Sequence, residues 1–167
     1  MNFKEALSKL KKSPEFKRFK KEHKDSYLCT GFFIIDSEGT NGTTQLNFQM
    51  RNEKIAAFSV GEDINVKIED LMIREKIPKL KESINKDIDD LQGILKRQIK
   101  EKDIRGKISK VMAILTNDGK NEIWNVTCFL ELMQIINIHV DANSGKVLKS
   151  EKMALDNFFK KPADYVG

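Results

Sequence analysis

The residues best suited to acid–base chemistry are His139 and Asp141, two positions apart, with Glu131 nearby in the chain. An imidazole and carboxylates in an apolar pocket exchange protons efficiently, because burial shifts their pKa values towards neutrality. In a strand, however, residue 139 points away from Ile138 and Val140, which favours exposure of the histidine. We therefore expect no catalytic residues and no enzyme. A small acid–base enzyme is the third of three functional hypotheses.

The cysteines and histidines do not form a recognisable ligand set. The two cysteines and two histidines are far apart in the sequence, so the spacing of a zinc site is absent. Nucleotide-binding, nucleophile-elbow and metalloprotease motifs are absent as well. We expect no cofactor and no metal. Cys29 and Cys128 are predicted to be unbonded, reduced thiols, with Cys128 in the core.

A basic segment at residues 1–25 is the strongest local signal for a ligand. It contains nine Lys or Arg and four acidic residues, so it carries a charge equal to the net +5 of the chain. The candidate nucleic-acid-binding residues are Lys17, Arg18, Lys20 and Lys21. Phe16 and Phe19 between them could stack on bases while the lysines neutralise phosphates. Their helical spacing favours instead buried aromatic rings with solvated lysines, so we expect weak, salt-screened binding to nucleic acid.

The elements that must position these residues occur twice. A gapless shift of 80 residues places Leu28 on Ile108 and Gly39 on Gly119, and apolar and turn positions coincide over more than 30 residues. This pattern predicts two copies of one α+β unit, with boundaries 1–69 and 70–167. We expect two tandem units, each a helix packed on an antiparallel β-meander of three to four strands.

Hydrophobic periodicity predicts the elements of each unit. The first unit is expected to have helices at 2–11 and 14–24 and strands at 26–36, 43–51, 54–60 and 63–68. The second is expected to have a helix along the apolar stripe Leu80, Ile84, Ile88, Leu91, Leu95 and Ile99, strands at 108–116, 122–132 and 134–141, and a short strand at Val147 and Leu148. Residues 150–167 are expected to carry a short apolar helix.

The second copy resembles a PepSY domain over about residues 79–150. The resemblance rests on residues 138–148, where an apolar strand leads into Asp141-Ala142, a Gly145 turn and a return strand, and on Trp124 in the preceding strand. The first copy departs from this pattern, because Gly61-Glu62-Asp63 occupies the corresponding turn. One helix followed by an antiparallel meander also resembles the cystatin-like layout, so the resemblance implies two tandem cystatin/PepSY-like units. It implies a non-catalytic binding or regulatory module, with an acid–base enzyme in a cystatin-like cone as the third hypothesis, and carries over no functional residue.

Location and function follow from these features. The apolar runs are only a few residues long, whereas a membrane-spanning helix needs about 20. The N-terminal residues are rich in lysine and have no apolar stretch typical of a secretion signal. We therefore expect a cytoplasmic protein without membrane insertion. The leading hypothesis is a non-catalytic module that binds another protein, docking it at exposed sheet edges; a nucleic-acid-associated protein is the alternative.

Overall fold

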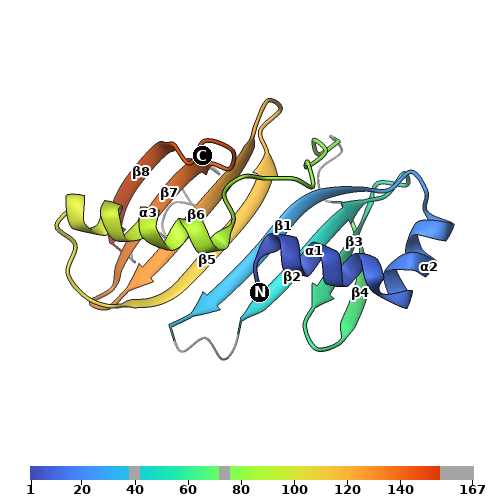
Figure 1. Cartoon of the computed structure of the whole chain (residues 1–167), viewed down its shortest axis with the longest axis horizontal. Helices are drawn as coiled ribbons and strands as arrows, with labels where there is room; N and C mark the ends of the chain where they lie inside the picture. Colours follow the sequence, from blue (N-terminus) through green and yellow to red (C-terminus); the bar gives the residue numbers. More distant parts are fainter. Residues whose placement is uncertain (38–41, 72–75, 155–167) are drawn as a thin grey trace.

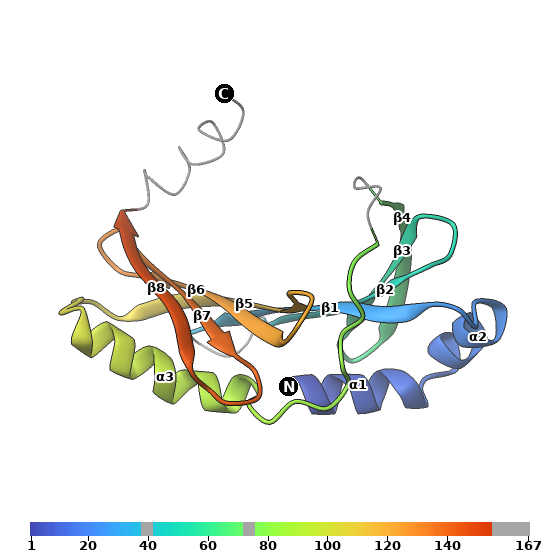
Figure 2. The same ribbon diagram turned by 90° about the horizontal axis from the view of Figure 1, so that it is seen from above.

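The computed structural model describes residues 1–37, 42–71 and 76–154. In these ranges the chain forms one antiparallel sheet of eight strands, in the order β4-β3-β2-β1-β5-β6-β7-β8. Its helices are α1 (Phe3–Lys12), α2 (Pro14–Glu22) and α3 (Ile88–Glu101), and its strands are β1 (Tyr27–Asp36), β2 (Thr43–Gln49), β3 (Lys54–Val60), β4 (Ile64–Asp70), β5 (Ile108–Asn117), β6 (Glu122–Leu130), β7 (Gln134–Asp141) and β8 (Val147–Ala154) (Figure 1). The helices lie on one side of the sheet (Figure 2). The chain is thus α+β.

The expectation of two separate helix-plus-meander units is wrong, because β1 and β5 pair and fuse all strands into a single sheet. At the join Phe33 lies opposite Ala113, the residue 80 positions later. Equivalent strands of the two repeats therefore meet about a local two-fold axis. Antiparallel pairing satisfies the backbone donors and acceptors of two strands that would otherwise be exposed edges.

The predicted strands are confirmed, but the predicted helix of the second copy is partly wrong. Helix α3 begins only at Ile88, and Leu80 and Ile84 are buried side chains of an irregular, otherwise mostly exposed segment before it. Backbone N–H of Leu80 donates to the carbonyl of Leu28 at 2.9 Å. Ser83 and Asp87 in this segment favour caps and turns over helix interiors. Of the predicted tail, residues 150–154 belong to β8, and the rest lies outside the described residues.

The N-termini of α1 and α3 meet at the buried carboxylate of Asp87. Asp87 is the N-cap of α3 and accepts from the backbone N–H of Ile88 at 2.7 Å. It also accepts from the first residues of α1, from Phe3 N at 2.9 Å and Lys4 N at 3.1 Å. A helix N-terminus has unpaired N–H groups and a partial positive charge, so one carboxylate stabilises both ends. Asp87 therefore links the helix layers of the two halves.

The main core fills the space between the sheet and the helices. At its centre the fully buried Trp124 packs near Phe33, with ring centroids 5.7 Å apart. The indole N–H of Trp124 donates to the carbonyl of Lys86 at 2.7 Å, which fixes the segment leading into α3. Under α2, the same core contains the packed rings of Phe16, Phe19 and Phe58. Within the described ranges, no helix is long and apolar enough to cross a bilayer.

Candidate functional site

The acid–base candidates are not assembled into one site. His139 pairs with Asn125 in the middle of β7, whereas Glu131 lies in the β6–β7 turn at the end of the sheet. The carboxylate of Asp141 accepts from the backbone N–H groups of Ser144 at 2.8 Å and Asn143 at 2.9 Å. These hydrogen bonds lower the pKa of Asp141, so its carboxylate is ionised and engaged in its own turn.

The imidazole of His139 is half-buried and held neutral. Burial lowers its pKa, and the positive charge of Lys149 on the neighbouring strand lowers it further. A neutral imidazole can accept a proton as a base. It can equally donate and accept hydrogen bonds on a recognition surface, so its neutral form does not indicate catalysis. In the described part of the chain, no group of three or more His, Cys, Asp or Glu side chains is placed to hold a metal ion.

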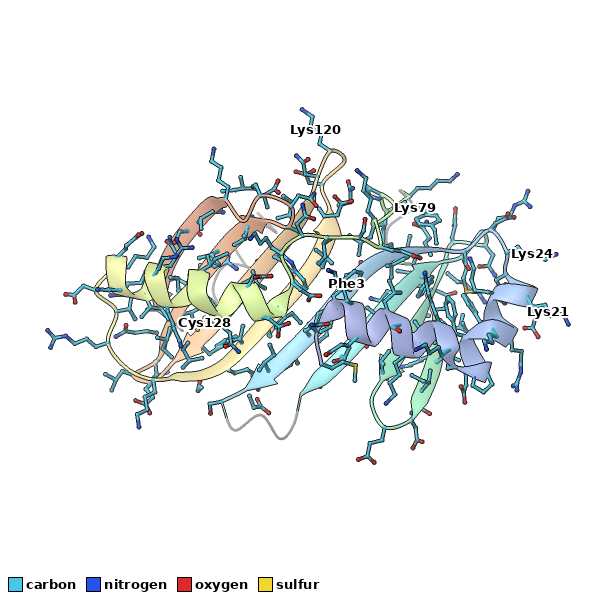
Figure 3. All side chains as sticks on the ribbon, in the orientation of Figure 1. Phe3, Lys21, Lys24, Lys79, Lys120 and Cys128 are labelled. Atoms are coloured by element: carbon cyan, nitrogen blue, oxygen red, sulfur yellow. The ribbon has the colours of Figure 1, made fainter. Side chains whose placement is uncertain are left out.

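The predicted nucleic-acid residues lie on α2, at the outer end of the helix layer. Lys17, Arg18 and Lys21 are exposed, and Figure 3 shows Lys21 projecting from this end. The ammonium group of Lys20 instead donates to the carbonyl of Ser26 at 2.7 Å, which secures the turn into β1. The aromatic residues between these lysines belong to the core described above. They are therefore not available for stacking on bases.

One hollow on the helix layer gathers lysines. It has a volume of about 510 Å³ and is lined by Lys4, Lys11, Lys12 and Lys17 together with Glu82. Glu82 forms an ion pair with Lys11, so one of the four cations is neutralised. Of the four predicted residues, Lys17 alone lines this hollow. Arg18, Lys20 and Lys21 therefore do not contribute to the lining of this hollow.

The helix-free face of the sheet carries a surface that the sequence-based analysis did not identify. In antiparallel strands, residues directly opposite one another point to the same face. One cross-strand row runs Gln45, Phe32, Ile114, Asn125 and His139. The next runs Thr43, Ile34, Met112, Thr127 and Asn137. We call these ten residues the central face. Both outer ends of the sheet rise on this side, so the central face lies on the inside of the curve (Figure 2).

The ten residues of the central face include no carboxylate, lysine or arginine, although charged residues make up 33% of the chain. The charges begin on β8, where the same two rows continue into Lys149 and Glu151, which form an ion pair. Its middle is apolar, with Phe32, Ile34, Met112 and Ile114 half-buried. Its flank is a network of amides and hydroxyls, in which Asn137 donates to Asn125 at 2.8 Å and to Thr127 at 3.0 Å. Depletion of charge around apolar side chains is typical of the centre of a protein–protein interface.

The sheet has two outer edges, at β4 and β8. On β4, Val66 and Ile68 are 44% and 45% exposed. Such an edge, with apolar side chains beside unpaired backbone groups, is able to accept a strand from a partner. On β8, the exposed positions include Lys149 and Lys152, charges that disfavour pairing with another strand.

The β6–β7 turn combines exposed apolar side chains with an unfavourable backbone. Leu132 and Met133 have φ angles of 62° and 56°, in the left-handed region that favours glycine or asparagine. They are also the most exposed large hydrophobic residues of the described chain, at 77% and 67%. Bulky residues in this conformation cost about 1 kcal/mol or more each. This strain is retained at the surface, where no packing requires it.

Replacing this pair with the usual turn residues should stabilise the protein. We expect L132N/M133G to raise the free energy of unfolding by about 1–2 kcal/mol, because asparagine and glycine adopt positive φ more easily. The melting temperature should rise by several degrees in a thermal scan. The control is Leu148→Asn, which removes an exposed apolar side chain from β8 without changing a left-handed residue. An unchanged or lower melting temperature for L132N/M133G would contradict the assigned strain.

Both thiols are free and buried, on different strands. Burial raises the pKa of Cys128 to about 12 and also raises that of Cys29. The thiolate is the reactive form, so buried thiols of high pKa react slowly. We expect fewer than one thiol per chain to react with an aromatic disulfide reagent at pH 8 in the native protein, and two in denaturant without reductant. Fast labelling of the native protein, or no labelling in denaturant, would refute this.

The comparisons with known proteins show no family for this chain. No protein-family profile matches the sequence, and no curated protein matches it. Among solved structures, the chain is similar to "a putative lipoprotein" from Clostridium difficile 630, with 17% sequence identity and a TM-score of 0.47. The match covers 83% of this chain and 90% of that one. This similarity is too distant to support an argument about function, and the PepSY resemblance stays a prediction.

Proposed function

We propose that this chain is a non-catalytic, cytoplasmic protein-binding module and that its partner docks on the central face. The observation that carries the proposal is that four apolar and six uncharged polar side chains occupy ten adjacent positions on β2, β1, β5, β6 and β7 of a highly charged chain. Side chains such as Phe32 and Ile114 lie half-buried there on the side without helices. The partner that fits is a folded protein with an uncharged, convex surface, because the face is apolar in the middle, polar at its rim and curved inward.

The amide network supports a recognition role more than a structural one. Gln45 donates to Asn47 at 2.9 Å, and Asn137 bridges two neighbouring strands. Amide groups have both donors and acceptors, so those not used within the network remain available to a partner. A partner that covered this face would bury the central apolar side chains and leave hydrogen-bonding groups at the rim, as in ordinary protein interfaces.

Site-specific photo-crosslinking tests the proposal. A photoreactive amino acid at position 114 should capture a discrete protein from native cytosol, with and without nuclease, whereas the same group at Leu148 on β8 should not. The captured partner is then purified and its affinity measured. Ile114→Glu should weaken binding by at least about tenfold, because it places an unpaired charge in a desolvated interface. Leu148→Glu is the matched control.

The outcome distinguishes the hypotheses. If Ile114→Glu retains its melting temperature and its affinity, the central face is not the docking surface. If capture occurs only through a group at position 68 on the exposed β4 edge, the partner adds a strand to that edge instead. Both results would overturn the proposed location.

The lysine-lined hollow favours nucleic acid as the second candidate function. Lys4, Lys12 and Lys17, the lysines of this hollow other than the one paired with Glu82, supply a positive field that attracts phosphates. Fluorescence anisotropy with single- and double-stranded oligonucleotides tests this. Tight binding that survives about 0.2 M salt, and is lost when Lys4, Lys12 and Lys17 are changed to Glu without unfolding, would favour this candidate over a protein partner.

A further inference from the structure

The β6–β7 turn presents apolar side chains that the fold does not require. The corresponding turn of the first repeat, 80 residues earlier, is Arg51-Asn52-Glu53, and it is polar. Glu53 there also has a positive φ, of 60°. The corresponding turns thus differ: residues 51–53 are hydrophilic and have one left-handed residue, whereas Leu132 and Met133 are apolar and both left-handed. An outlier in backbone conformation that also exposes apolar surface points to a function of the tip.

A basic segment lies against this turn. Residues 96–110 contain seven Lys or Arg and two acidic residues, although the chain outside residues 1–25 is neutral as a whole. The backbone N–H of Glu131 donates to the carbonyl of Lys107 at 2.9 Å. Gly106, at φ 110°, lies so close to Glu131 that a Cβ there would be 3.4 Å from it. The loop and the turn therefore form one end of the sheet.

The cations of this segment are available to a ligand. The ion pairs between described residues involve none of the seven. Six of them are exposed and Lys102 is half-buried. Three of them lie in the C-terminal half of α3, and Lys100 is in its last turn, where the negative end of the helix dipole favours a cation. The opposite end of α3 carries Asp89 and Asp90, so the positive charge is concentrated at the end near the turn.

We propose that this end of the sheet binds an anionic lipid surface. Leu132 and Met133 enter the boundary between head groups and acyl chains, and the basic segment contacts the head groups. A fluid interface accepts two neighbouring apolar side chains without a matching pocket, and it requires only the opposite charge, which this end supplies. Long lysine and arginine side chains reach the head groups while the turn inserts. The inference does not depend on a protein partner at the central face.

Co-sedimentation with vesicles tests the proposal with the whole chain. We expect binding to phosphatidylcholine vesicles that contain about 30% phosphatidylserine, and weak binding to phosphatidylcholine alone. L132N/M133G should lower the partition coefficient by about tenfold, and so should R105E/K107E. The controls are Leu148→Asn for apolar exposure and K79E/K81E for charge, both of which should bind like the natural chain.

A fluorophore reports whether the turn itself inserts. Since the native thiols are buried, Leu132→Cys provides one reactive site for an environment-sensitive label. Its emission should shift to shorter wavelength with anionic vesicles, whereas a label at Asn52→Cys in the polar turn should not shift. Equal binding to both lipid compositions, full binding by L132N/M133G, or no shift at position 132 would each overturn the proposal. Absence of any vesicle binding would also overturn the proposal. It would favour an acidic protein with an apolar pocket as the partner of this end of the sheet.

Discussion

Trp124→Ala is expected to lower the free energy of unfolding by about 3–5 kcal/mol, the usual loss for a large aromatic side chain deleted from a core. Trp124 is fully buried between the sheet and the segment before α3. Its removal leaves a cavity beside Phe33 at the join of the two repeats. It also leaves the carbonyl of Lys86 without the indole donor. Urea denaturation followed by circular dichroism measures the change, since the variant has no tryptophan to report by fluorescence.

Trp124→Phe separates the two contributions. Phenylalanine keeps much of the apolar contact and loses the hydrogen bond to Lys86, so we expect about half the loss or less. A loss below about 1 kcal/mol for Trp124→Ala would show that the site collapses around the missing ring. That result would contradict the interpretation that Trp124 stabilises the packing between the two halves of the core.

Asp87→Ala is expected to cost about 2–4 kcal/mol, more than the loss of an ordinary helix cap. The substitution removes the N-cap of α3 and also the acceptor for the first backbone N–H groups of α1. Buried N–H groups left without an acceptor add their own desolvation cost. We expect lower resistance to urea, and faster amide hydrogen exchange at Phe3 and Lys4.

Two variants serve as controls for Asp87. Asp87→Asn keeps a side-chain oxygen that caps helices and should lose less stability than alanine. Asp89→Ala removes an exposed carboxylate of the first turn of α3, which accepts from the side chain of Asn2, and should cost less than about 1 kcal/mol. If Asp87→Ala costs no more than Asp89→Ala, the double cap does not stabilise the junction.

The first strand of the join between the repeats carries a signal in its sequence. Residues 31–35 form a continuous apolar run, so β1 has apolar side chains on both faces. Such a run indicates a strand without a polar, solvated face, whereas a strand with one solvated face alternates. Phe32 and Ile34 therefore indicate an apolar second face, but they do not indicate which strands pair with β1. Their position in the central face required the β1–β5 register, which pairs them with Ile114 and Met112.

The helix of the second repeat shows where periodicity misleads. Leu80 and Ile84 continue the spacing of the helical stripe, and both are buried as the stripe predicts. They reach the core from an irregular segment instead, held by the bond from Leu80 to Leu28 and by Asp87 as a cap. Periodicity identifies which residues face the core, and it does not identify the backbone conformation that brings them there.

The sequence by itself determined the strands, the amphipathic faces of the helices and the 80-residue repeat, because alternation, helical spacing and turn residues act over a few neighbouring positions. Tertiary structure alone decided that the repeats share one sheet, that Asp87 caps two helices, and that a charge-free face and an apolar turn beside a basic loop arise. Each of these depends on backbone groups or side chains far apart in the chain, such as Phe33 and Ala113. Backbone pairing between edge strands is nearly independent of residue type, so no local pattern predicts which edges meet.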